Sequence, residues 1–174
     1  DPYFPTLGNG GYDAGHYLLD LEVDPEANVL RGEATMSATA TADLEVLHLD
    51  FLGLTVDEVS VDGVPSPFTR EDGELIVDPA ALLPAGESFA VSIAYHGTPE
   101  PLHTLGFPLG WVDAGEISYV VAEPDAARTW FPANDHPADK AAYRFEITVP
   151  EPWVVAASGD LAQQDDLGDG DRRE

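Results

Sequence analysis

Apolar and polar residues alternate along much of this sequence. The alternation is clearest over residues 17–23, 29–41, 89–95 and 143–149, where nearly every second side chain is apolar. A repeat of two residues places apolar side chains on one face of a strand and polar ones on the other. This pattern is typical of antiparallel sheets with one buried face. We therefore predict at least four half-buried strands.

The alternation changes phase within residues 54–61. Leu54 and Val56 share one phase, whereas Val59 and Val61 share the other. A strand that keeps one face buried through such a change must correct its register, so the change predicts a β-bulge or a bend.

Turn-forming residues separate the predicted strands. Asp-Gly pairs at 62–63 and 72–73 are typical of two-residue hairpin loops, and the segment 24–28 links the first two long strands. No stretch long enough for a stable helix repeats with the helical period. We therefore expect an all-β domain of packed or strongly curved antiparallel sheets, sandwich-like, with little helix.

Two segments depart from the strand pattern. Residues 97–116 contain three prolines and four glycines, and we interpret them as a long surface loop. Residues 165–174 have turn composition with a hairpin tip near 168–170. We assign 1–160 to one β domain and 161–174 to a hairpin or truncated end of the same domain. Truncation there predicts an open strand edge near 155–174, at which a second copy could pair as an edge-strand dimer.

The charge balance narrows the range of partners. The chain has 33 acidic residues against 7 basic ones, a net charge of −26, and Lys140 is its only lysine. Without a basic stripe to neutralise phosphates, nucleic acid is excluded as a partner and anionic membranes are disfavoured. No apolar run approaches the roughly 18 residues that a membrane span requires, so we expect no membrane insertion.

The chain also lacks the common catalytic motifs. It has no cysteine, so it has no thiol nucleophile and no cysteine zinc ligand. Its five histidines form no H-E-x-x-H motif, and Ser158-Gly159 is not a nucleophile elbow. We expect no metal site and no catalytic residue in this chain.

The most residue-specific segment is 122–137, AEPDAARTWFPANDHP. Pro124, Pro132 and Pro137 fix backbone angles and remove hydrogen-bond donors, so this segment must leave the sheet. A side-chain pair between Arg128 and Asp135 would tie it to itself. Two interpretations stay open: a well-packed crossover loop, or a loop that carries Glu123 into a cleft.

Several motifs resemble the signature of the aminopeptidase N-like zinc metallopeptidases, the gluzincin aminopeptidases. They are AEPDAAR at 122–128, FPANDHP at 131–137, which includes Pro132, Asp135 and Pro137, and Lys140 with Ala141. The strand sequence at 143–150 and the AASG at 156–159 are similar to the family's sequel. Two positions depart from the pattern: Val121 stands where the family has Gln, and Ala133 where it has Cys.

The resemblance implies a saddle-shaped N-terminal β domain without its own cofactor. The family's zinc, with its H-E-x-x-H ligands, lies in a following catalytic domain that is absent here, and the parent protein removes N-terminal residues from peptides. The Glu of the Glu-Pro step binds the substrate's α-amine, which maps onto Glu123. The implied partners are the catalytic domain and a peptide substrate.

Other hypotheses stay open at this point. The chain could be a stand-alone β-sandwich binding module for carbohydrate or protein, or belong to a relative whose catalytic domain has lost its zinc ligands. The chain begins at Asp1, which indicates that an upstream segment was removed. Together with the acidic surface and the similarity to bacterial relatives, this leads us to expect a secreted or cell-surface protein.

Overall fold

The computed structural model describes residues 7–104, 106–168 and 170–173. This part of the chain contains fourteen β-strands, one short 3-10 helix and no α-helix. None of its helices is long and apolar enough to cross a membrane. The strands are β1 (Tyr12–Asp24), β2 (Val29–Ala40), β3 (Leu47–Asp50), β4 (Thr55–Val61), β5 (Val64–Pro65), β6 (Phe68–Glu71), β7 (Glu74–Val77), β8 (Ser88–Gly97), β9 (Leu102–Thr104), β10 (Phe107–Asp113), β11 (Ser118–Val121), β12 (Ala142–Pro150), β13 (Asp165–Gly168) and β14 (Asp171–Arg173), and the 3-10 helix is η1 (Ala127–Thr129).

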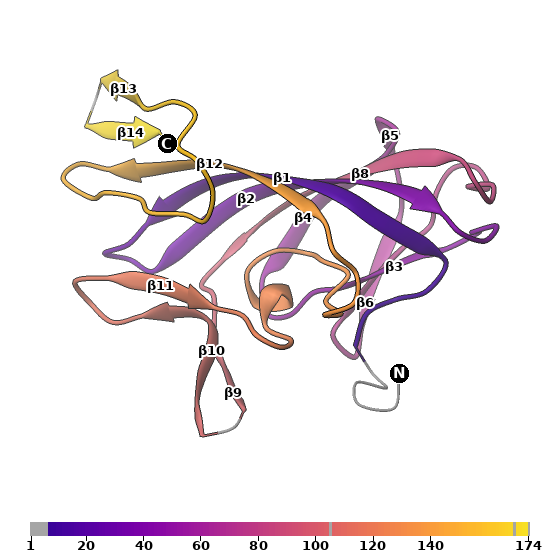
Figure 1. Cartoon of the computed structure of the whole chain (residues 1–174), viewed down its shortest axis with the longest axis horizontal. Coiled ribbons are helices and arrows are strands. Elements are labelled where there is room, and N and C mark those ends of the chain that lie inside the picture. The colour runs from indigo at the N-terminus through magenta and orange to yellow at the C-terminus, as the bar shows by residue number, and fades with distance from the viewer. Residues whose placement is uncertain (1–6, 105, 169, 174) are drawn as a thin grey trace.

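One large twisted sheet forms the upper layer of the domain (Figure 1). Its eight strands are ordered β13-β14-β12-β1-β2-β8-β4-β5. Most neighbours are antiparallel, but β1 and β12 run parallel, from His16 paired with Ala142 to Glu22 paired with Thr148. The all-β prediction is confirmed. The expectation of purely antiparallel sheets is wrong at this one pair, because the chain returns to β1 through a long crossover instead of a hairpin.

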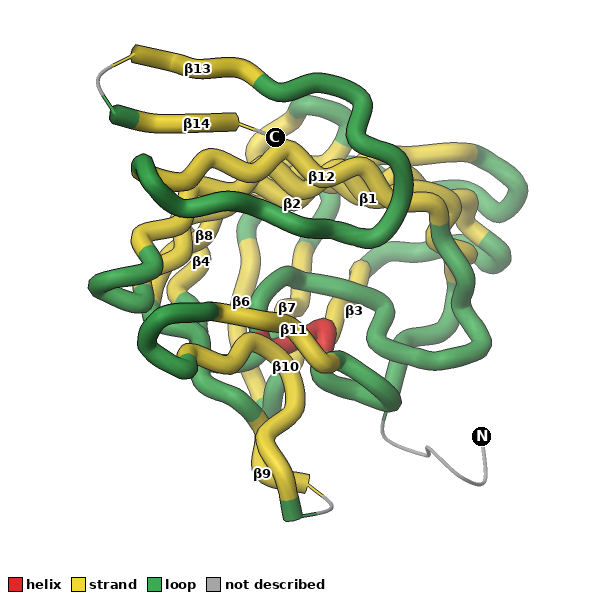
Figure 2. The backbone as a smooth tube through the Cα atoms, turned by 60° about the vertical axis from the view of Figure 1, so that its left-hand side comes forward, coloured by secondary structure: helices red, strands yellow, loops and turns green. Residues whose placement is uncertain are grey.

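Two small sheets form a second layer beneath the large one. They are ordered β3-β7-β6 and β11-β10-β9. Figure 2 shows η1 among these strands, below the large sheet. The two layers enclose a core to which the alternating residues of the long strands contribute, among them Leu19, Leu21 and Leu30, each fully buried.

The phase change within residues 54–61 and the two Asp-Gly pairs both correspond to features of the structure. The pairing of β4 with β8 shifts between Val56 and Glu58, which confirms the predicted bulge. Asp62 and Asp72 both have a φ of 50°, as two-residue hairpin loops of this kind require. Because a bulge corrects the phase, both halves of β4 can face the same core.

The interpretation of 97–116 as a surface loop is wrong. Within this range β9 pairs with β10, and β10 continues to pair with β11. Leu109 and Val112 are buried. The prolines and glycines concealed these strands because the strands are short, and Pro108 lies in a small sheet with few ladder bonds to lose.

The C-terminal residues form a hairpin on the large sheet. β13 and β14 pair with each other, and β14 also pairs with β12 from Thr148 to Pro150. Residue 169, in the predicted tip, lies outside the described residues. β14 is therefore covered on both sides, whereas β13 is the edge strand and its residues are exposed.

We predict that Gly32 cannot be enlarged without loss of stability. A Cβ at this position would lie 2.5 Å from Cζ of Tyr95 and 2.6 Å from its hydroxyl oxygen. Tyr95 is 1% exposed, so its ring has little room to move. Gly32→Ala should lower the free energy of unfolding by about 1–3 kcal/mol, measured by urea denaturation.

Gly15→Ala is the matched control for this prediction, because the nearest atom to its added Cβ is the Ser37 carbonyl oxygen at 3.5 Å. Equal stability of the two variants would contradict the close packing of Tyr95 on Gly32.

Candidate functional site

Residues 122–137, which we call the arch, connect β11 to β12 beneath the large sheet (Figure 1). Backbone hydrogen bonds fasten it to the end of β3. Asp50 and Ala133 exchange two such bonds, with N···O distances of 2.8 and 3.0 Å, and the amide of Leu52 donates to the carbonyl of Arg128 at 2.7 Å. The arch is therefore an ordered part of the core layer, although it is mostly irregular.

Aromatic side chains hold the middle of the arch. Phe131 packs edge-on against Tyr17, with ring centroids 5.6 Å apart. Trp130 stacks against Phe145, with ring centroids 6.4 Å apart. The hydroxyl of Tyr17 also accepts a hydrogen bond from the Asn134 amide at 3.0 Å. Trp130 and Phe131 are 9% and 2% exposed, so they anchor the segment in the core.

Carboxylates satisfy the arch's backbone donors. Asp50, fully buried, accepts the Asp135 amide at 2.9 Å. The Asp135 carboxylate accepts the Arg128 amide at 3.0 Å. That amide lies at the start of η1, where no intrahelical acceptor exists, so a side-chain oxygen takes its place.

The predicted side-chain pair between Arg128 and Asp135 is wrong in its detail. The two residues are joined, but through the Arg128 backbone. The guanidinium group instead donates to Asp125 at 3.2 Å and lies 3.9 Å from Oδ1 of Asp50. Asp135 is already occupied by the start of η1, so the arginine neutralises the other two acids nearby.

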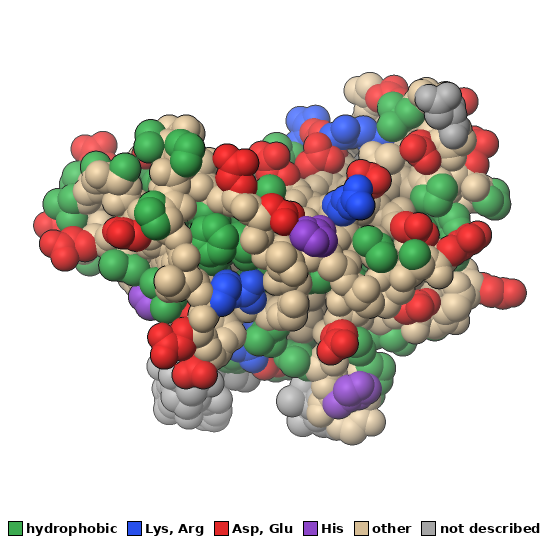
Figure 3. All heavy atoms as spheres, turned by 180° about the vertical axis from the view of Figure 1, so that it is seen from behind, with side chains coloured by type: hydrophobic (Ala, Val, Ile, Leu, Met, Phe, Trp, Pro, Cys, Tyr) green, Lys and Arg blue, Asp and Glu red, His purple; other side chains and the backbone are tan. Residues whose placement is uncertain are grey.

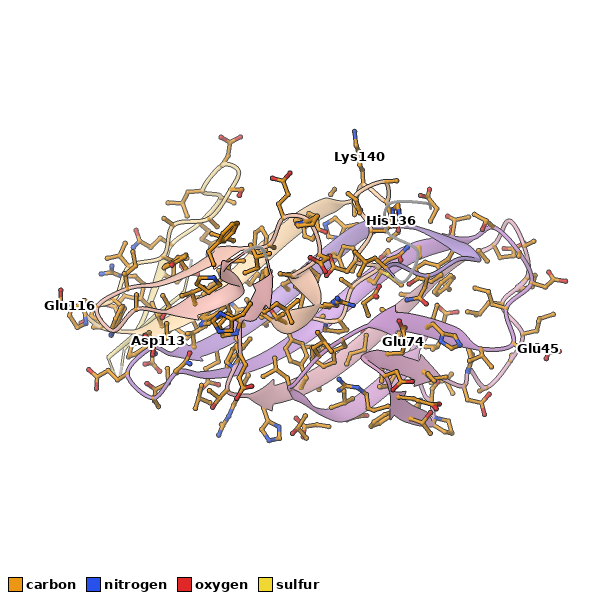
Figure 4. All side chains as sticks on the ribbon, turned by 90° about the horizontal axis from the view of Figure 1, so that it is seen from below. Glu45, Glu74, Asp113, Glu116, His136 and Lys140 are labelled. Carbon is orange, nitrogen blue, oxygen red and sulfur yellow. The ribbon has the colours of Figure 1, made fainter. Side chains whose placement is uncertain are left out.

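The base of the arch holds further polar residues that the sequence did not reveal. The Asn9 side-chain amide donates to Asp50 at 3.3 Å and to Glu74 at 3.1 Å. Figure 4 labels Glu74 on its strand. Burial raises the pKa of Asp50 and of Glu74, and raises that of Asp135 to about 6. These contacts join distant parts of the chain, so no local motif could have indicated them.

Glu123 differs from these acids. It is exposed, and within the described residues its carboxylate makes no hydrogen bond or ion pair. It follows the end of β11 and precedes the buried turn around Ala126. A free carboxylate on a fixed backbone can accept charge-assisted hydrogen bonds from a cationic group.

The other motif residues lie along the second half of the arch and just beyond it. Pro132 is buried, whereas Pro137 and Lys140 are exposed. In Figure 4 the Lys140 side chain extends away from the ribbon. Pro132 therefore belongs to the packed part of the arch, and Lys140 belongs to the surface.

The described residues form no metal centre and no basic surface. They contain no group of three or more His, Cys, Asp or Glu side chains that could hold a metal ion. Acidic side chains are spread over the face seen in Figure 3, with fewer Lys and Arg side chains among them. No catalytic zinc site can therefore be assigned within the described residues.

Asp135 should make stability depend on pH. Its pKa is about 6 in the folded protein against 3.8 when unperturbed, so the folded state binds more protons in this window. Stability should consequently fall as pH rises from about 4 to about 6. Asp135→Asn retains an oxygen for the Arg128 amide but removes the charge. It should raise the free energy of unfolding at pH 7.5 by about 1–2 kcal/mol and flatten the slope between pH 4 and 6.

Denaturant melts at a series of pH values would measure this effect. Asp160→Asn, the same change at an exposed acid, is the control. A destabilised Asp135→Asn variant at pH 7.5, or an unchanged slope, would contradict the unfavourable burial of this charge.

The comparisons with known proteins all indicate the same family. A family model described as the peptidase M1 N-terminal domain matches residues 13–174. Aminopeptidase M1-D from Oryza sativa subsp. japonica is 28% identical over 150 residues, which are 82% of this chain and 17% of that protein.

Solved structures agree with this. An M1 zinc metallopeptidase from Deinococcus radiodurans superposes with a TM-score of 0.91 at 33% identity, over 98% of this chain and 39% of its own. A mutant from the same organism, bound to a Tyr-Ser-Ala substrate, gives 0.91 at 32% identity, over 98% and 40%. Aminopeptidase A from Legionella pneumophila, at 17% identity and a TM-score of 0.80 over 97% and 20%, shares the fold.

The chain spans less than half the length of these relatives. The resemblance suggested by the motifs at 122–141 is confirmed by the match over 13–174 and by the superposed structures. This chain belongs to the peptidase M1 N-terminal domain family.

Proposed function

We propose that this domain is the non-catalytic N-terminal part of a zinc metallo-aminopeptidase. It packs on a catalytic domain and contributes Glu123 to the binding of the substrate's free α-amine. The observation that carries the proposal is the exposed, unpaired carboxylate of Glu123 on an otherwise fixed arch.

The Glu123 carboxylate has the properties that binding of a protonated α-amine requires. A protonated α-amine needs an acceptor whose lone pairs are free and whose position is fixed, because a mobile carboxylate would lose entropy on binding. Fixing the amine also places the first peptide bond at a defined distance from the catalytic group, which is how positioning lowers a barrier. The neighbouring acid Asp125 is already paired with Arg128, so it is less suited to this role.

Zinc belongs outside this chain. The described residues offer no ligand set, whereas the longer relatives are named zinc metallopeptidases and one is described with a bound Tyr-Ser-Ala substrate. A catalytic domain of the parent protein would supply the metal and the hydrolytic chemistry. This chain would supply a surface and one carboxylate. The family match favours this hypothesis over a stand-alone carbohydrate- or protein-binding module.

Apolar residues beside Glu123 support the proposed contact between the two domains. Tyr119, Val120 and Val121 are 41%, 39% and 42% exposed on the strand that leads into the arch. Neighbouring apolar side chains left in water are typical of surfaces that another protein part covers. A catalytic domain that packs here would enclose Glu123 at the edge of its cleft.

A dimer of isolated domains is a weaker proposal. The edge strand β13 is open along its exposed residues, which is the requirement for pairing with a second copy. Asp165 and Asp166 lie on that strand, so charge repulsion opposes such pairing, and we expect it only at high salt.

Glu123→Gln in the full-length protein tests the amine-binding role. The change keeps the size of the side chain and removes its charge. It should lower kcat/KM for peptides with a free N-terminus by roughly 10-fold or more, the loss expected for a hydrogen bond to a charged group. Peptides whose α-amine is replaced by hydrogen should be affected much less.

Glu116→Gln, an equal charge change at another exposed acid, should leave both peptide classes unaffected. Equal losses for both peptide classes in Glu123→Gln would mean that this residue does not bind the amine.

Zinc binding and hydrolysis should be found in the full-length protein and not in this domain alone. The 174-residue chain, purified alone, should bind no stoichiometric zinc and cleave no aminoacyl substrate, because its described residues offer no group of three ligands with an open fourth position. The full-length protein should contain zinc and lose activity to a chelator. Chelator-sensitive hydrolysis by the domain alone would overturn this assignment.

A further inference from the structure

Gly110 lies where the two ends of the Glu123-bearing turn meet. Along β10 it pairs with Val121, the last residue of β11 before the arch. On its other side, a Cβ would lie 2.1 Å from Oγ1 of Thr129 and 3.3 Å from the carbonyl oxygen of Ala126. Its φ of +94° is also a value that favours glycine. Only glycine allows β10 and the turn to approach so closely.

Hydrogen bonds close the turn itself. The amide of Ala126 donates to the carbonyl of Ala122 at 2.9 Å. The hydroxyl of Thr129 donates to the carbonyl of Ala126 at 2.8 Å. Ala126 and Thr129 are 0% and 2% exposed. The buried side of the turn is therefore fixed against Gly110, whereas Glu123, between the two bonded residues Ala122 and Ala126, is exposed.

We infer that Gly110 and Thr129 are positioning residues that set where the Glu123 carboxylate stands. This inference rests on the proposed amine-binding function. The close approach at Gly110 fixes the depth of the turn, and the Thr129 hydroxyl fixes its shape. Any side chain at position 110 would push the turn outward and carry Glu123 with it. Neither residue needs to touch the substrate to have this effect.

A packing role alone would give a different result from a positioning role. Loss of packing would reduce stability and lower the activity of every variant background by the same factor. A positioning residue acts through Glu123, so its effect should disappear when Glu123 no longer binds the amine. A double-mutant cycle separates these two outcomes.

The cycle uses the zinc-loaded full-length protein and a peptide with a free N-terminus. Gly110→Ala should lower kcat/KM by roughly 10-fold, and by no more than Glu123→Gln does, because it acts only by misplacing that carboxylate. In the Glu123→Gln background the same change should cost less than about 2-fold. Equal losses in both backgrounds would overturn the inference.

Gly115→Ala is the matched control. Gly115 lies in the same β10–β11 hairpin with a φ of +85°, and no atom lies within 4 Å of its added Cβ. It therefore imposes similar backbone strain without displacing the turn. It should leave kcat/KM within about 2-fold of wild type in both backgrounds; a loss as large as that of Gly110→Ala would assign the effect to strain and contradict the inference.

Thr129→Val covers the case in which Gly110→Ala does not fold. It keeps the shape of the side chain and removes the hydroxyl's bond to the Ala126 carbonyl, while the backbone amide bond at 3.3 Å remains. It should show the same dependence on Glu123, and losses that add to those of Glu123→Gln would overturn the inference. If Glu123→Gln alone leaves kcat/KM unchanged, the proposed function fails and this inference fails with it. If Glu123→Gln lowers kcat/KM but Gly110→Ala and Thr129→Val add to it independently, only the positioning role fails.

Discussion

The structure depends on how a buried, irregular segment satisfies its backbone polar groups. Such groups cost free energy when they are buried without a partner, and outside a sheet they have no ladder to join. The arch meets this constraint with partners from distant strands. Asp50 accepts the Asp135 amide through its side chain and exchanges two backbone bonds with Ala133, and the Tyr17 hydroxyl accepts the Asn134 amide between them. The Asp50 bonds join the arch to β3 within the second layer, whereas the Tyr17 bond and the aromatic packing join the arch to the large sheet.

The same segment holds acids in two opposite environments. Asp135 is buried, where its pKa is raised, and it is retained because the start of η1 needs an acceptor. Glu123 is exposed and accepts nothing from the described residues. The difference follows from the path of the backbone, which turns outward between Ala122 and Ala126 and inward at Thr129.

The parts of the fold that could be predicted from the sequence are those that depend on a local pattern of residues. The long strands and the bulge near residue 57 can be recognised from the two-residue period of apolar side chains. The hairpin turns can be recognised from their Asp-Gly pairs. The anchoring of the arch by Trp130 and Phe131 was also predictable from their size. The parallel pair was not, because pairing direction depends on a crossover of many residues. Asp50, Glu74 and Asn9 were not predictable as partners either, since tertiary structure alone brings them together.

The parallel pairing of β1 with β12 has a consequence for synthesis on the ribosome. β1 is the first of the described strands in chain order, yet its partner on one side begins only at Ala142. Until then β1 has an open edge, and the aromatic residues that β12 contributes against the arch are missing. The domain must therefore remain incomplete until β12 has been synthesised, and its strongly negative charge is well suited to keep such nascent chains apart on a polysome.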